Sequence, residues 1–127
     1  MTTRSASRWL VLAAVVGLVG CGGGPPPPTD PAAGVAVLRA ALEAWQAGET
    51  PDALKGRTPA VTVVDKDWTG GAKLARFEID ETAAQPNGYD LGCPVKLWLG
   101  DGKKPPVRVR YVVALSPNTV VTRDFGG

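Results

Sequence analysis

The sequence contains no histidine among its 127 residues and only two cysteines, Cys21 and Cys93. Without histidine, the chain lacks the side chain that most often activates a serine or cysteine nucleophile and acts as a general base. Zinc sites are built mainly from Cys and His ligands, and Cys93 has no such companion in the folded part of the chain. We therefore expect no enzyme, no cofactor and no metal site.

Charge is missing from a stretch near the N-terminus. Arg4 and Arg8 precede residues 9–20, which carry no charge, and no acidic residue occurs before Asp30. This run of 12 residues is too short to span a hydrocarbon core, which needs about 20 apolar residues. A basic segment followed by a short apolar run is typical of a secretory signal peptide.

The apolar run ends in Leu18-Val19-Gly20-Cys21, which resembles the lipobox of bacterial lipoproteins, the recognition site of their dedicated signal peptidase. The resemblance implies that the Cys21 thiol receives a diacylglyceryl group and that cleavage makes Cys21 the first residue. Two or more acyl chains attach a protein stably to a membrane. We expect residues 1–20 to be the signal peptide. The alternatives are an ordinary signal peptide with an incidental cysteine, or a short anchor helix.

Residues 21–30 form the expected linker, in which three glycines and four prolines follow Cys21. Residues 22–30 span at most roughly 30 Å when extended. In lipoproteins of envelopes with two membranes, an aspartate after the lipidated cysteine tends to retain the protein at the inner membrane. Gly22 occupies that position here, so we expect the periplasmic side of the outer membrane rather than the inner membrane.

Residues 21–127, the chain left after signal cleavage, carry no net charge, because the loss of Arg4 and Arg8 leaves 12 basic residues against 12 acidic ones. A neutral domain gives no electrostatic reason to bind nucleic acid. About 95 residues suffice for one modest core, so we expect residues 31–127 to form a single small domain that is monomeric. With Cys21 lipidated, Cys93 has no disulfide partner within the chain.

One helix is predicted at the start of this domain. Asp30-Pro31 has the character of an N-cap and first helical position, and Gly48 that of the residue after a helix end. Between them an apolar stripe repeats at spacings of three and four; it consists of Val35, Leu38, Leu42 and Trp45. A second short helical turn is predicted after Thr50-Pro51, ending at Gly56.

Strands are predicted after Arg57, because apolar and polar residues alternate there with a period of two. The expected strands are residues 61–64, 75–80, 89–99, 107–115 and 119–123. The predicted fold class is α+β, with one N-terminal helix packed on a four- to five-stranded antiparallel sheet. This architecture resembles the cystatin-like and NTF2-like folds, although the Gln-x-Val-x-Gly loop of cystatin inhibitors and the His/Asp pocket of NTF2-like enzymes have no counterpart.

Trp98 is the most informative candidate for a functional surface. Alternation places it with Lys96 on the face opposite the core, and Arg108 and Arg110 share that face on the next strand. A stack of Trp98 on Arg108 or Arg110 is one interpretation, and a partner-binding surface formed by all four residues is the other.

Three further features have simpler interpretations. Asp65 and Asp67 are expected in a solvated turn rather than at a cation site, which would need more oxygen ligands. Cys93 is expected to be a small buried hydrophobe rather than a redox thiol. Trp68 follows a turn, and the pattern leaves its exposure open.

These observations predict a membrane-tethered lipoprotein of the cell envelope whose small domain binds a partner or has a structural role without catalysis. The partner would be the membrane, through the lipid anchor, together with an envelope protein. The alternatives are an NTF2-like enzyme acting on a small molecule and a cystatin-like protease inhibitor.

Overall fold

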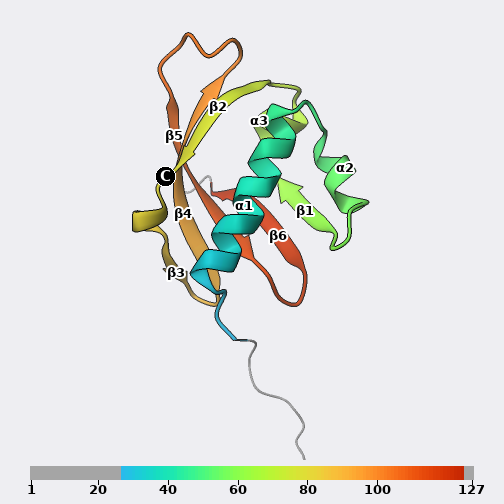
Figure 1. Cartoon of the computed structure of the whole chain (residues 1–127), viewed down its shortest axis with the longest axis vertical. Helices are drawn as coiled ribbons and strands as arrows, with labels where there is room; N and C mark the ends of the chain where they lie inside the picture. The colour runs from blue at the N-terminus through green and yellow to red at the C-terminus, as the bar shows by residue number, and fades with distance from the viewer. Residues whose placement is uncertain (1–26, 125–127) are drawn as a thin grey trace, which may run out of the picture.

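A computed structural model of the chain describes residues 27–124. The expected signal peptide, Cys21 and the first part of the linker lie outside the described residues. The described part has an α+β fold (Figure 1). In chain order its elements are α1 (Pro31–Gln46), α2 (Pro51–Lys55), β1 (Val61–Val64), α3 (Lys66–Thr69), β2 (Leu74–Ile79), the 3₁₀ turn η1 (Glu81–Ala83), β3 (Gln85–Asn87), β4 (Asp90–Leu99), β5 (Val107–Ala114) and β6 (Thr119–Asp124).

Helix α1 begins and ends where the sequence predicts. The Asp30 side chain accepts a hydrogen bond from the backbone N–H of Ala33 at 3.0 Å, which satisfies a donor of the first turn. Gly48 follows the helix end with φ of +93°, a left-handed conformation that favours glycine. The short helix α2 is also confirmed, with Thr50 as its N-cap and Gly56 as its C-cap.

The prediction of a solvated turn at Asp65 and Asp67 is wrong. Asp65 is instead the N-cap of the four-residue helix α3, and its side chain accepts from the backbone N–H groups of Asp67 and Trp68. Asp65 is buried. A helix of one turn is too short to show an apolar period, so the alternation of charges gave no sign of it.

The sheet has six strands in the order β1-β6-β5-β4-β2, with β3 paired to β4. Strands β2, β4, β5 and β6 are antiparallel neighbours, as expected. The expectation of a purely antiparallel sheet of four to five strands is wrong, because β1 lies beside β6 and runs parallel to it. The alternation within a strand tells which side chains share a face, but it does not tell which strand lies alongside.

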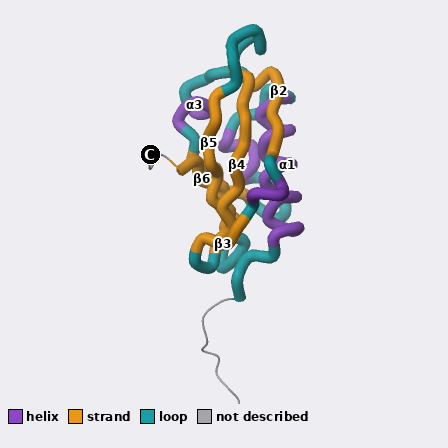
Figure 2. Tube along the Cα trace, turned by 90° about the vertical axis from the view of Figure 1, so that its left-hand side faces the viewer, coloured by secondary structure: helices purple, strands orange, loops and turns teal. Residues whose placement is uncertain are grey.

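Helix α1 contacts β2, β4 and β5, and Figure 2 shows it against one side of the strands. The apolar stripe of α1 and the inward side chains of the strands fill the space between them. Residues at most 1% exposed in this core are Leu38, Ala41, Leu42, Leu54, Leu91, Cys93, Leu97, Tyr111, Val113 and Val121. Gly34 lets α1 approach β4 closely, since a Cβ at that position would lie 2.7 Å from the Leu91 side chain.

Candidate functional site on the outer sheet face

The outer sheet face is the face of the sheet opposite α1. Along β4, Val95 and Leu97 are buried in the core, whereas Lys96 and Trp98 are partly exposed. The alternation of β4 thus places Lys96 and Trp98 on the outer sheet face, as the sequence predicts. Arg108 and Arg110 of β5 lie on the same face, because Arg108 pairs with Lys96 in the register of the two strands and Arg110 pairs with Pro94.

Trp98 is stacked against an arginine of β2. The guanidinium carbon of Arg76 lies 4.3 Å from the centre of the Trp98 ring system, and Arg76 is its register partner. The prediction that Arg108 or Arg110 forms this stack is wrong. The register of β5 with β4 ends at Leu97 and Val107, so β5 does not extend beside Trp98.

Arg110 is already engaged within the fold. Its guanidinium forms an ion pair of 3.1 Å with Asp124 of β6. It also lies over Gly92, where an added Cβ would come within 2.2 Å of an Arg110 nitrogen. Arg110 is therefore a structural part of the outer sheet face rather than an open binding group.

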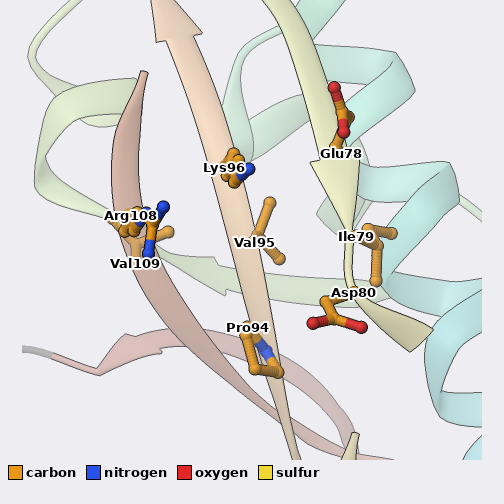
Figure 3. Close-up of a pocket in the computed structure, with 8 residues that line it drawn as sticks. All are labelled: Glu78, Ile79, Asp80, Pro94, Val95, Lys96, Arg108 and Val109. Carbon is orange, nitrogen blue, oxygen red and sulfur yellow. The ribbon is translucent and has the colours of Figure 1, made fainter. Parts of the chain in front are cut away.

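Lys96 and Arg108, in contrast, have no ion pair or side-chain hydrogen bond with any residue between 27 and 124. Both line a hollow of about 480 Å³ in the outer sheet face (Figure 3). Its lining residues are Glu78, Ile79, Asp80, Pro94, Val95, Lys96, Arg108 and Val109. Of the four residues predicted as a partner surface, these two are the ones with charge available to a ligand.

A second cluster of charges is buried on the inner side of the sheet. One carboxylate oxygen of Asp65 accepts from Arg123 at 3.2 Å, and the other accepts from the hydroxyl of Tyr111. The same Arg123 nitrogen also donates to Asp67. Both carboxylates are thus paired with an arginine, so a cation has no reason to bind there.

The ionisation of this cluster follows from its surroundings. Burial, together with the nearby charge and hydrogen bond of Asp65, raises the pKa of Tyr111. Burial alone would lower the pKa of Arg123, but the interactions with Asp67 and Asp65 outweigh it and the pKa is raised. The cluster is therefore a neutral phenol beside a permanent cation and its carboxylates. Sequence reasoning missed Arg123, although its alternation with Val121 is the signal that places it inward.

Cys93 and Trp68 both belong to the core. Cys93 is buried, and burial raises the pKa of its thiol while the charge of Arg110 acts in the opposite direction. A buried thiol is a poor nucleophile, and its interpretation as a small hydrophobe is confirmed. Trp68 is stacked on Trp45 with the ring centres 5.2 Å apart. Its indole N–H donates to the backbone oxygen of Glu49 at 2.7 Å.

None of the helices within residues 27–124 is long and apolar enough to cross a membrane. In the same part of the chain, no three Cys, Asp or Glu side chains come together as metal ligands. Comparison of the chain with protein-family models, with curated proteins and with solved structures found no match.

Proposed function

We propose that this chain is a cell-envelope lipoprotein, anchored through Cys21, whose small domain binds a partner at the outer sheet face without catalysing a reaction. One observation carries the binding role: Lys96 and Arg108 line a surface hollow without a partner in residues 27–124, whereas the neighbouring arginines Arg76 and Arg110 are paired with carboxylates. Charged groups left unpaired beside a hollow are available to fix the orientation of a ligand.

Support for the anchor comes from the order of features before the domain. The basic residues, the short apolar run and the Leu18-Val19-Gly20-Cys21 junction follow one another at the spacing of a lipoprotein signal. The last residues of the linker are held against the domain at a defined place, because the backbone N–H of Thr29 donates to the backbone oxygen of Tyr89 at 2.8 Å. The periplasmic side of the outer membrane remains the favoured location, since Gly22 rather than aspartate follows Cys21.

The finer likeness to cystatin-like and NTF2-like folds is also kept as a proposal. A helix packed across an antiparallel run of β2, β4, β5 and β6 supports it. The parallel strand β1 departs from it. Neither an NTF2-like enzyme nor a cystatin-like inhibitor is favoured by a particular contact, since the buried carboxylate of Asp65 and the half-buried carboxylate of Asp67 are paired with Arg123.

Crosslinking in intact cells tests the binding role. A photo-crosslinking amino acid is placed at Pro94, which lines the hollow without carrying a charge, or at Lys55 on α2 as the exposed control. We expect the position 94 protein to form a defined adduct in the membrane fraction and the position 55 protein to form none. Equal adducts from both positions, or none from position 94, would contradict a partner site on this face.

Trp98→Ala refines the same experiment. Loss of the stack with Arg76 should cost roughly 0.5–1 kcal/mol, the usual size of a partly exposed cation–π contact. If the aromatic ring belongs to the partner surface, the adduct from position 94 should fall well beyond what this small loss of stability explains. An unchanged adduct would confine the surface to the charged residues.

A further inference from the structure

The hollow in the outer sheet face lies across three neighbouring strands, β2, β4 and β5, with Asp80 at the end of β2. Its volume of about 480 Å³ falls within the range of small-ligand pockets in proteins. We call it the outer hollow.

Charges of opposite sign line opposite sides of the outer hollow. Figure 3 shows Glu78 and Asp80 on the β2 side, and Lys96 and Arg108 on the β4 and β5 side. Glu78, Lys96 and Arg108 also form one cross-strand row in the register of the sheet. The formal charges of the four side chains cancel, so the outer hollow as a whole attracts neither a polyanion nor a polycation strongly.

Three of these side chains form no ion pair within residues 27–124. Oδ1 of Asp80 accepts from the Thr82 hydroxyl at 2.7 Å and from the Ala83 backbone, whereas its Oδ2 accepts no hydrogen bond there. Lys96 and Arg108 have no partner in that part of the chain. Glu78 differs because its charge is already compensated by an ion pair of 2.5 Å between its Oε2 and Arg76. A matching ligand therefore needs a carboxylate at one end and a cationic donor at the other.

The distance across the strands sets the length of such a ligand. Neighbouring strands lie about 4.8 Å apart, so β2 and β5, on either side of β4, are separated by roughly 10 Å. An extended peptide advances about 3.3–3.6 Å per residue. A tripeptide spans roughly 10 Å and reaches from β2 to β5, and a dipeptide spans about 7 Å and reaches from β2 to a point between β4 and β5, where Lys96 and Arg108 can share its carboxylate. A single amino acid holds its two charges much closer together.

We infer that the outer hollow binds short zwitterionic peptides, with the carboxylate held by Lys96 and Arg108 and the ammonium held by Asp80. Arginine and lysine both donate charge-assisted hydrogen bonds to carboxylates, and arginine can do so in a bidentate manner. This inference rests on the proposed binding role of the outer sheet face and names the class of ligand bound there.

A titration of the full-length protein in a non-ionic detergent tests the inference. The probes are the dipeptide Ala-Ala, its N-acetyl form and its C-terminal amide, and the readout is the backbone amide shifts of isotope-labelled β2, β4 and β5. We expect saturable shifts with Ala-Ala. Each blocked form should bind about tenfold or more weakly, because it leaves one charged group of the protein unpaired.

Variants assign the two ends of the ligand. Lys96→Gln and Arg108→Gln should weaken Ala-Ala by about tenfold each while leaving the amide form unchanged, because that form has no carboxylate. Asp80→Asn keeps the oxygen that caps η1 and should weaken Ala-Ala and the amide form but not the N-acetyl form. Lys103→Gln, in the exposed β4–β5 loop, removes the same charge as Lys96→Gln and should change nothing.

The inference is overturned if Ala-Ala gives no saturable shift, if the three probes bind alike, or if the N-acetyl form binds best, which would define a simple anion site. Because this titration needs neither the lipid anchor nor a protein partner, its failure leaves the crosslinking result at position 94 to decide the proposed function separately.

Discussion

At the scale of single residues, Asp65 joins separate parts of the molecule through one carboxylate. It caps α3 and accepts from Tyr111 of β5 and Arg123 of β6. Buried ion pairs contribute little net stability compared with apolar packing, but removing one partner leaves a buried charge unpaired and is strongly destabilising. We therefore interpret this cluster as the contact that fixes α3, and with it the end of the neighbouring strand β1, against β5 and β6.

Asp65→Ala should lower the free energy of unfolding by about 3–5 kcal/mol, because the buried Tyr111 hydroxyl and the first turn of α3 lose their acceptor and the buried Arg123 loses one of its carboxylate partners. Urea unfolding measures the change. Asp52→Ala is the matched control, since Asp52 pairs with Lys55 at 3.4 Å on the exposed surface of α2; it should cost no more than about 1 kcal/mol. Equal losses from the two variants would show that the Asp65 cluster does not hold the fold as described.

The raised pKa of Tyr111 predicts a loss of stability at high pH. The unfolded chain releases the phenol proton near the ordinary value of about 10, whereas the folded state still holds it. The unfolded state then binds fewer protons, so the free energy of unfolding falls as pH rises, by up to about 1.4 kcal/mol per pH unit for one group. The contribution of the Tyr111 phenol to the free energy of unfolding is fully present below pH 10 and decreases as the pH rises above 10.

Tyr111→Phe should remove this slope above pH 10, while Tyr89→Phe at an exposed position should retain it. Cys93 also makes the free energy of unfolding fall with rising pH, starting at a lower pH than Tyr111, because burial raises the pKa of its thiol too. Both tyrosine variants are therefore compared in a Cys93→Ala background by unfolding between pH 8 and 11. A slope that persists in Tyr111→Phe would assign the effect to another group.

At the scale of secondary-structure elements, the sequence predicts the helices and strands that are marked by capping residues or by a long apolar period. Helix α1 is marked by Asp30, Pro31 and Gly48, and β4 by its long alternation of apolar and polar residues. Helix α3 and strand β3 are too short to show any period. The parallel pairing of β1 with β6 depends on contacts distant in the sequence, which alternation does not encode.

The same distinction applies to the candidate site. Alternation placed Lys96, Trp98, Arg108 and Arg110 on one face. It did not reveal that Arg76 stacks on Trp98 or that Asp124 neutralises Arg110, because both depend on which strand lies beside which. The outer hollow and its acidic side were likewise missed, since Asp80 enters it only through the pairing of β2 with β4.

The packing of α1 on α3 and the sheet depends most on Trp45. Its ring stacks on Trp68 and its indole N–H donates to the backbone oxygen of Ala72 at 2.7 Å. Trp45→Ala should lower the free energy of unfolding by about 3–5 kcal/mol, as for other buried aromatics. Gln46→Ala, the exposed neighbour whose side chain bonds to Ala75, should cost no more than about 1.5 kcal/mol. A loss below 1 kcal/mol for Trp45→Ala in denaturant unfolding would contradict the packing.

At the scale of the whole molecule, the chain enters the described domain at one end. The chain enters beside Tyr89, at the start of β4, and Figure 1 shows the β4–β5 loop at the opposite end of the molecule. Lys96 lies six residues along β4 from Asp90, which is about 20 Å at the rise of a strand. If Cys21 is the anchor, as proposed, Lys96 lies roughly 20 Å along β4 from the end of the domain to which the linker is attached.

Lipidation of Cys21 is the central claim, and metabolic labelling with a radioactive fatty acid tests it most directly. Wild-type protein should incorporate the label and enter the detergent phase in phase partitioning. Cys21→Ala should incorporate none and stay in the aqueous phase or remain as unprocessed precursor, while Cys93→Ala should behave like wild type. Labelling of Cys21→Ala equal to that of wild type, or wild-type protein without label, would contradict the account.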